Sequence, residues 1–308
     1  MALVVGGGIL LTGYFVSRPD AADPATGSTI EAEVDLGSDF TLACVPGLES
    51  ACDELAEALG IQSETWMTGE PLPDRGVVLA PASDFEGVEI GPVVAESPIV
   101  FAGWRDRWQI LQLACDDNVD AACIVDSAGQ TWTDLQGRPD WGDFKIALAD
   151  PTLSEPALLA WSVLAPDIPA NPQGFAAALR SVGRSDARLM ADLVAFGDSR
   201  ADVVVTTEAA VIAQFENAIN RGGRFELGYP AAGPWVEYVA VGNGRGADDL
   251  IETLQSEEAA RRFTAAGVRP AGGTVGSLPD GMGTPGEKTP SPSDAERGTL
   301  TSLWEDIR

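Results

Sequence analysis

Short polar loops follow four apolar stretches of the sequence, and most of these loops carry a hydroxyl group. Each loop stands where a strand would end and a helix would begin, so backbone N–H groups and hydroxyls would converge there. The residues that we expect to contact a ligand are Gly47, Ser83, Thr152, Ser154, Thr206 and Thr207. This pattern predicts a site for an anion or a small polar solute, although each hydroxyl could equally cap a helix.

The residue types argue against catalysis. Gly197-Asp198-Ser199 resembles the nucleophile block of a hydrolase, but the chain contains no His to activate the serine. The glycines from Gly242 to Gly246 lack the spacing and flanking elements of a dinucleotide-binding loop. Acidic residues are so numerous that their spacing singles out no catalytic pair. We therefore expect no enzymatic activity, no cofactor and no catalytic residue.

The composition is that of a globular protein with an unusual charge. Hydrophobic residues make up 45% of the 308 residues, while the formal net charge is −28. A nucleic-acid-binding surface needs basic residues, so this charge argues against a nucleic-acid partner. It also argues against docking on anionic lipid through a basic patch.

The four cysteines are spaced as two local pairs. Cys44 and Cys52 are eight residues apart, and so are Cys115 and Cys123. Four cysteines allow three pairings, of which the two local disulfides are the simplest. Disulfides would place the protein in an oxidising compartment. A zinc site and four unpaired buried thiols are the alternatives, although the spacing lacks the CxxC motif of most zinc sites, and we expect no metal.

The N-terminal region predicts export. Residues Ala2 to Val16 carry no charge, and this length suits the core of a signal peptide better than a full membrane span. No clear cleavage site follows, so we favour an uncleaved anchor. Residues Pro19 to Ser28 are rich in Asp, Pro, Ala and Gly and predict a tether.

The rest of the chain alternates between strand and helix patterns, which predicts an α/β protein. The sequence predicts two separate apolar runs within Ile90–Phe101, a loop-rich segment over Ile124–Gly137, and one helical region from Gly174 to Phe196 with a break near Gly183. Residues 271–292 are rich in Gly, Pro, Ser and Thr and predict a linker or disordered tail. A capping-box pattern, Ser293-x-x-Glu296, then predicts a short helix that is docked, frayed or bound to a partner.

Several motifs, in their order along the chain, resemble the type II periplasmic solute-binding proteins, and most closely the molybdate-binding type. Ile146-Ala-Leu-Ala-Asp-Pro151 before a helix is similar to that family's second-lobe strand and turn. Gly197-Asp-Ser-Arg-Ala-Asp202 before a strand, and Leu254 through Pro270, are similar to its later motifs. The chain also resembles the binding-protein half of actinobacterial surface proteins that carry a von Willebrand A domain.

The resemblance implies a two-lobed type II periplasmic-binding-protein fold, in which each lobe is a mixed sheet flanked by helices. It implies crossover strands near Pro98–Gly103 and Glu237–Val241. The expected division is 1–17 anchor, 18–35 tether, 36–101 first part of lobe 1, 102–235 lobe 2, 236–270 return segment of lobe 1, and 271–308 tail.

The function that the resemblance implies is that of an extracellular, membrane-tethered protein that captures a small polar or anionic solute between its lobes. An ABC permease would be its partner, and the protein would lie on the outer face of the cell membrane or be secreted. The alternative is a tethered interaction or sensor protein that keeps the fold without transport.

Overall fold

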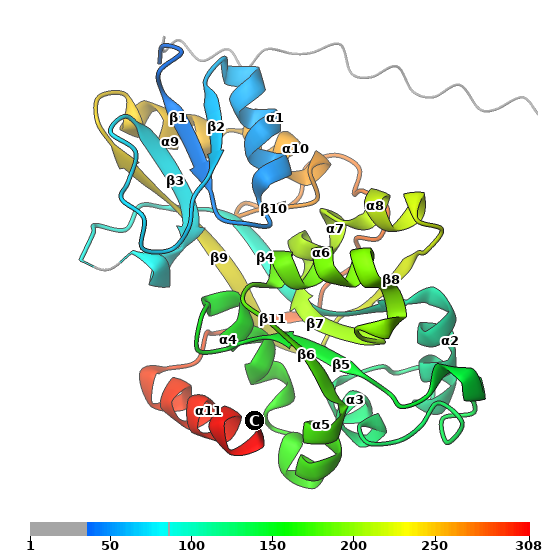
Figure 1. Cartoon of the computed structure of the whole chain (residues 1–308). Helices are drawn as coiled ribbons and strands as arrows, with labels where there is room; N and C mark the ends of the chain where they lie inside the picture. The colour runs from blue at the N-terminus through cyan, green and yellow to red at the C-terminus, as the bar shows by residue number, and fades with distance from the viewer. Residues whose placement is uncertain (1–35, 86) are drawn as a thin grey trace, which may run out of the picture.

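The computed structural model describes residues 36–85 and 87–308 (Figure 1). The expected anchor and tether lie outside these residues. Within the described part of the chain, no helix is both long and apolar enough to cross a membrane.

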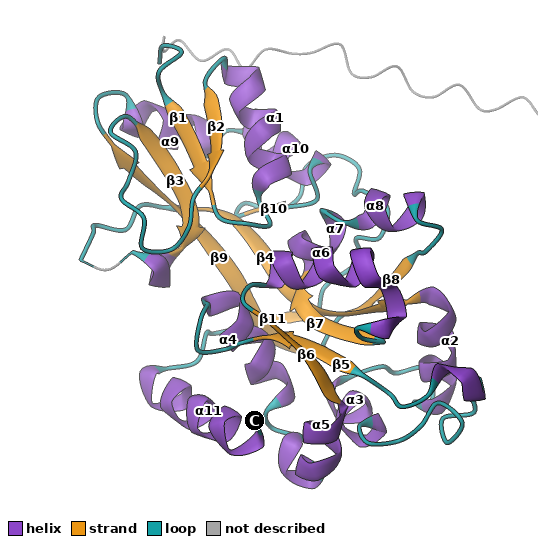
Figure 2. Ribbon diagram, viewed as in Figure 1, coloured by secondary structure: helices purple, strands orange, loops and turns teal. Residues whose placement is uncertain are grey.

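Lobe 1 is a mixed sheet with strands in the order β2-β1-β3-β9-β4. The apolar run at Thr41 forms a buried strand parallel to both of its neighbours, whereas β9 is antiparallel to β3. Helices cover this sheet (Figure 2). The elements of this lobe are β1 (Thr41–Cys44), α1 (Glu49–Leu59), β2 (Gln62–Thr65), β3 (Gly76–Pro81), the 3-10 helix η1 (Ala82–Asp84), α9 (Ala247–Leu254) and α10 (Glu257–Ala265).

Lobe 2 is a second mixed sheet with the order β4-β7-β5-β6, and β8 pairs with β4. Its central strands are short and fully buried, as their apolar sequences require. Its elements are α2 (Arg105–Ala114), α3 (Ala121–Ser127), η2 (Pro139–Trp141), β5 (Ile146–Ala149), α4 (Glu155–Leu164), η3 (Ile168–Ala170), α5 (Pro172–Ala178), β6 (Leu179–Gly183), α6 (Asp186–Phe196), η4 (Gly197–Ser199), β7 (Val203–Thr207), α7 (Glu208–Ile212), α8 (Phe215–Asn220) and β8 (Phe225–Gly228).

Two long strands, β4 (Val93–Trp104) and β9 (Ala232–Asn243), join the lobes. Figure 1 shows both running from one lobe into the other. The two apolar runs within Ile90–Phe101 lie in one continuous strand, β4, which also contains the expected crossover Pro98–Gly103. Pro98 stands where β4 stops pairing with β9 and begins pairing with β7 at Ile99. Proline lacks an N–H donor, so it fits at this change of partner.

Two predictions are confirmed in part. The segment Ile124–Gly137 is loop-rich, but its first residues belong to the helix α3, whose N-cap Asp120 accepts a hydrogen bond from Cys123 N. The helical region from Gly174 to Phe196 is interrupted near Gly183 as expected, but the interruption is a strand, β6, between α5 and α6, which the sequence did not predict. Residues of β6 alternate between exposed and half-buried, so this strand lies at the edge of the sheet and has a weak apolar signal.

The C-terminal segment, which we define as residues 271–308, is packed against the molecule. It contains β11 (Glu287–Thr289), which pairs with β9, and α11 (Asp294–Ile307), and it follows the short strand β10 (Arg269–Pro270). The predicted capping box of Ser293 and Glu296 is present, and Trp304 is buried. Residues 271–292 have little regular structure, as a linker would, but β11 pairs them with β9, so they are not a disordered tail. Of the alternatives for the short helix, the docked one is present, because apolar residues of α11 pack on α4 and α5.

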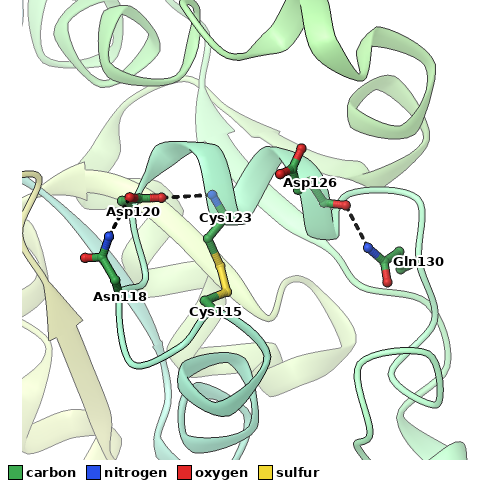
Figure 3. The surroundings of a disulfide bond; sticks show 6 residues. All are labelled: Cys115, Asn118, Asp120, Cys123, Asp126 and Gln130. Carbon is green, nitrogen blue, oxygen red and sulfur yellow. Dashed lines mark hydrogen bonds between the residues drawn. A yellow bond between two sulfur atoms is a disulfide. The ribbon is translucent and has the colours of Figure 1, made fainter.

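The two disulfides are the local pairs, Cys44–Cys52 and Cys115–Cys123, with Cα–Cα distances of 6.5 and 5.8 Å. The first joins the end of β1 to α1 and encloses the loop that contains Gly47. The second joins the end of α2 to α3 (Figure 3), where Asp120 also accepts a hydrogen bond from Asn118. Paired cysteines cannot be zinc ligands or free thiols, so both alternatives are removed.

Candidate functional site

A cavity of about 630 Å³ lies between the two lobes. Lobe 1 contributes the loop after β1 and the start of α1, and lobe 2 contributes α6, α7 and α8. The polar and charged residues that line it are Glu49, Ser50, Arg184, Ser185, Arg188, Gln214 and Asn217. A cavity of this size, open to both lobes, matches the dimensions of sites for small solutes.

The lobes touch at one edge of this cavity. Gly47 has a φ of +102°, and a Cβ atom there would lie 3.8 Å from the Cβ of Ala187 in α6. The backbone N–H of Gly47 donates to the Glu49 carboxylate at 2.6 Å. The first turn of α1 therefore carries its own acidic group, which favours the N-terminus of a helix.

Lobe 2 supplies basic side chains at the start of α6. The Ser185 hydroxyl caps the helix by accepting a hydrogen bond from Arg188 N at 3.3 Å. Arg188 pairs with Asp192 within the same helix at 3.2 Å. Arg184 is exposed on the cavity and forms no hydrogen bond or ion pair with any residue of the described chain. Its guanidinium group is therefore available to a solute.

A buried polar cluster lies beside the cavity, where the start of α6 meets the end of β7. The Thr207 hydroxyl donates to Asp186 Oδ2 at 2.6 Å, and Ala187 N donates to Oδ1 at 2.9 Å. Burial raises the pKa of Asp186, these hydrogen bonds lower it, and the charge of Glu49 raises it. Burial and the charge of Asp186 also raise the pKa of Tyr238 far above its usual value.

The β5–α4 loop satisfies its own polar groups. Thr152 donates to Asp150 Oδ1 through its N–H at 3.0 Å and its hydroxyl at 2.7 Å. Arg308 pairs with the other oxygen of Asp150 at 2.6 Å. Burial raises the pKa of Asp150, but the Thr152 hydrogen bonds and the charge of Arg308 outweigh it, so the pKa is lowered. Ser154 caps α4 through Ala157 N at 3.4 Å.

Acidic side chains approach each other from the two lobes near this loop. Asp84, at the end of η1 in lobe 1, accepts a hydrogen bond from the Thr68 hydroxyl at 2.9 Å. Burial raises the pKa of Asp84, Thr68 lowers it, and the negative charge of Glu155 in lobe 2 raises it.

The structure brings only one of the predicted ligand contacts, Gly47, onto the cavity. Ser83 is exposed beside Asp84, whereas Thr152, Ser154 and Thr207 form the internal hydrogen bonds described above. Thr206 is buried, and its hydroxyl has no hydrogen-bond partner in the described part of the chain. The assignment of these residues to a ligand stays a prediction.

Sequence reasoning missed most of the residues that line the cavity. Ser50 and Asn217 are ordinary helix residues, and Gln214 stands in the turn between α7 and α8; none has a local signature. A signal existed for Ser185, because Ser185-Asp186 before an apolar helix is a typical N-cap pattern. A larger cavity, about 960 Å³, lies between α4, the start of β9 and α11. It belongs to lobe 2 and the C-terminal segment alone, so lobe closure would not enclose a solute there.

Comparisons with known proteins support the fold and leave the solute open. No protein-family model matches the sequence, and no curated protein is similar to it. The structure is similar to AfuA, a periplasmic binding protein from Actinobacillus pleuropneumoniae solved with fructose-6-phosphate. That likeness has 12% identity and a TM-score of 0.55, and it covers 87% of this chain and 97% of AfuA.

Two further solved structures are similar at a TM-score of 0.50. One is AcbH, a bacterial solute receptor with a preference for β-D-galactopyranose, at 12% identity over 88% of this chain and 98% of that one. The other is a putative extracellular solute-binding protein from Bordetella parapertussis, at 10% identity over 87% and 98%. At such low identity these likenesses establish the fold alone. The chain has the two-lobed α/β fold of the type II periplasmic solute-binding proteins.

Proposed function

We propose that this protein is an extracellular solute-binding protein that captures a small polar or anionic solute between its lobes. The observation that carries the proposal is the cavity of about 630 Å³, which residues of both lobes line. A solute that contacts both lobes binds the closed arrangement better than the open one, and this difference in affinity drives closure.

The side chains on the cavity favour a solute with one anionic group and several hydroxyl or amino groups. Arg184 and the start of α6 offer positive charge on one wall, and Glu49 holds a negative charge on the other. Ser50, Gln214 and Asn217 offer hydrogen bonds. A solute with several negative charges would be repelled by Glu49 and by the net charge of −28.

Transport through an ABC permease and a membrane tether complete the proposal. Two disulfides support an oxidising, extracellular location. The solved proteins of similar structure are binding proteins, which supports binding over catalysis as the role of the cavity. The anchor expected in residues 1–17 lies outside the described residues.

A thermal-shift screen of the purified full-length protein would test the proposal. The panel would hold sugars, sugar phosphates, amino acids and inorganic oxyanions. A solute that binds only the folded state adds about 2.7 kcal/mol of stability at a hundredfold excess over Kd. We expect one class of solute to raise the melting temperature, and we expect Arg184→Ala to lower the affinity for that solute at least tenfold.

The matched control is Arg180→Ala, because Arg180 is an exposed arginine four residues away that pairs with Asp143 outside the cavity. Equal loss of affinity in the two variants would show that Arg184 acts only through net charge. A folded protein that shifts with no member of the panel would argue against solute capture.

A second candidate function is a tethered interaction or sensor protein without transport. The observation that favours it is the internal hydrogen bonding of Thr152, Ser154 and Thr207, which leaves these loops with few free groups for a solute. The same screen separates solute capture from a tethered interaction protein, since an interaction protein predicts no response to any small solute.

A further inference from the structure

The C-terminal segment is a third connection between the lobes, in addition to β4 and β9. It leaves lobe 1 at β10, which pairs with β4 at Ala95 and Glu96. It ends as α11 on lobe 2, beside α4 and α5 (Figure 1). Two crossover strands allow a hinge to bend, and a further connection along the same side would restrict that motion.

Hydrogen bonds fasten the segment to both lobes along its path. In lobe 1, Ala271 N donates to Val94 O at 3.2 Å, and Val275 N donates to the Thr264 hydroxyl at 3.2 Å. In lobe 2, Gly283 N donates to the Tyr229 hydroxyl at 2.7 Å, and Glu287 N donates to Ala231 O at 2.9 Å.

A buried ion pair joins the beginning of this connection to the second lobe. Arg269 of β10 forms a bidentate pair with Glu208 of α7, at 2.7 and 2.8 Å, and also donates to Gly283 O at 2.7 Å. The Tyr229 hydroxyl donates to the same carboxylate. Both members of the pair are buried, which makes its geometry stiff. Glu208 directly follows Thr207, the partner of Asp186 beside the cavity.

Lys288 of β11 occupies the centre of the hinge. Glu96 of β4 and Glu237 of β9 are direct cross-strand partners, and like charges in such positions repel. The Lys288 ammonium group lies 2.6 Å from the Glu96 carboxylate and 2.5 Å from the Glu237 carboxylate. The C-terminal segment therefore supplies the positive charge that holds the two crossover strands together.

The far end of the segment is anchored on α4. Arg297 forms a bidentate pair with Glu155, and the Trp161 indole N–H donates to Leu300 O at 2.9 Å. The rings of Trp161 and buried Trp304 meet edge to face at 5.2 Å. Because both ends are fixed, the stretch that contains Lys288 cannot move away from the hinge without breaking these contacts.

We propose that the C-terminal segment limits how far the lobes separate, and that Lys288 is the residue that positions the crossover strands. The inference rests on the proposed function only in assuming that the lobes open and close around a solute. The hinge geometry itself comes from contacts within the chain.

The test is the distance between the lobes in solution without any solute. Spin labels attached to the cysteines of Glu57→Cys in α1 and Ala177→Cys in α5 report this distance in the full-length protein, measured by pulsed electron paramagnetic resonance. In the protein that keeps Lys288 we expect a narrow distribution of distances between the two labels. In Lys288→Gln we expect a broader distribution with a longer mean distance. Adding Glu96→Gln to Lys288→Gln should restore the narrow distribution, because only one carboxylate then remains at the hinge.

Arg261→Gln is the matched control, because among residues 36–85 and 87–308 Arg261 pairs with Glu257 and Glu258 of its own helix, so its loss should leave the distance unchanged. Near-ultraviolet circular dichroism checks that each variant is folded. A folded Lys288→Gln protein with the original distribution would overturn the proposal, and so would a distribution that Glu96→Gln does not restore. Since no solute is present, this failure is separate from a failure of the thermal-shift screen.

Discussion

Arg297 of the C-terminal helix and Glu155 of α4 form a bidentate ion pair, with N–O distances of 2.5 and 2.6 Å. Their side chains are 28% and 11% exposed, so water screens the pair only in part. Glu155 is the first residue of α4. The loop before it, between β5 and α4, contains the predicted ligand contacts Thr152 and Ser154. The C-terminal segment thus neutralises an acidic group in the first turn of α4.

Arg297→Ala should lower the free energy of unfolding by about 1–2 kcal/mol, because Glu155 would remain half-buried without its partner. Urea unfolding followed by tryptophan fluorescence measures this loss, since buried Trp304 of α11 contacts Trp161 of α4. Arg261→Ala removes an exposed pair and should change the stability by less than about 0.5 kcal/mol. Equal losses in the two variants would contradict a special role for the Arg297 pair.

The two disulfides should contribute similar stability but different effects on binding. Each closes a loop with a sequence separation of 8 residues. The loss of loop-closure entropy in the unfolded chain then corresponds to about 2.5 kcal/mol each. The double serine variant Cys44→Ser/Cys52→Ser should also weaken solute binding, because this disulfide encloses Gly47 at the cavity.

The variant Cys115→Ser/Cys123→Ser serves as the control, since that disulfide joins α2 to α3 away from the cavity. Urea unfolding and calorimetric titration with the solute found in the screen would measure the two effects. A loss of affinity that is the same for both double variants would show that only stability matters.

Much of the fold follows from local sequence signals. The strands expected at Ile146 and after Asp202 are present as β5 and β7. The glycine after α1, Gly60, adopts the left-handed conformation that ends a helix, with φ +68°. Ser154 and Thr207 cap helices as their types favour. The edge strand β6 was missed because its exposure weakens the apolar pattern. The crossover Pro98–Gly103 was expected, but its continuation back to Val93 was not, because Pro98 interrupts the pattern.

The candidate site was less predictable because it depends on contacts between distant parts of the chain. Arg184 and Ser50 meet the same cavity only because α6 of one lobe packs near α1 of the other. The apolar residues of α11 allow its docking to be inferred from the sequence. They do not show that Trp161 of α4 is its contact. Sequence patterns report local structure, whereas the placement of two lobes is set by their crossover strands.

Gly47→Ala should cost more stability than Gly60→Ala. Gly47 has a φ of +102°, beyond the left-handed well that other residues can adopt, whereas Gly60 lies within it at +68°. Backbone strain of this kind costs about 1–3 kcal/mol, and we expect the upper half of this range for Gly47 and about 1 kcal/mol for Gly60. Thermal unfolding of both variants tests the difference, because a Cβ atom meets no close neighbour at either position. Equal costs would mean that the loop relaxes freely.

The last prediction concerns the pH dependence of Asp186. Burial, opposed by hydrogen bonds from Thr207 and Ala187, raises its pKa in the folded state. A raised pKa means that the folded protein holds this proton more tightly than the unfolded chain. The stability that this group contributes is therefore fully present below the unfolded pKa, about 4, and is lost as the pH rises through the folded pKa.

Asp186→Asn removes the ionisation while its amide oxygen can still accept the Thr207 hydrogen bond. We expect the stability of the variant relative to the original protein to increase above about pH 4, by at most about 1.4 kcal/mol per pH unit. Urea unfolding between pH 4 and pH 8 measures this difference. Asp192→Asn, on the same helix, controls for the loss of one negative charge. Parallel pH curves for the original protein and Asp186→Asn would show that the buried carboxyl ionises as freely as an exposed one.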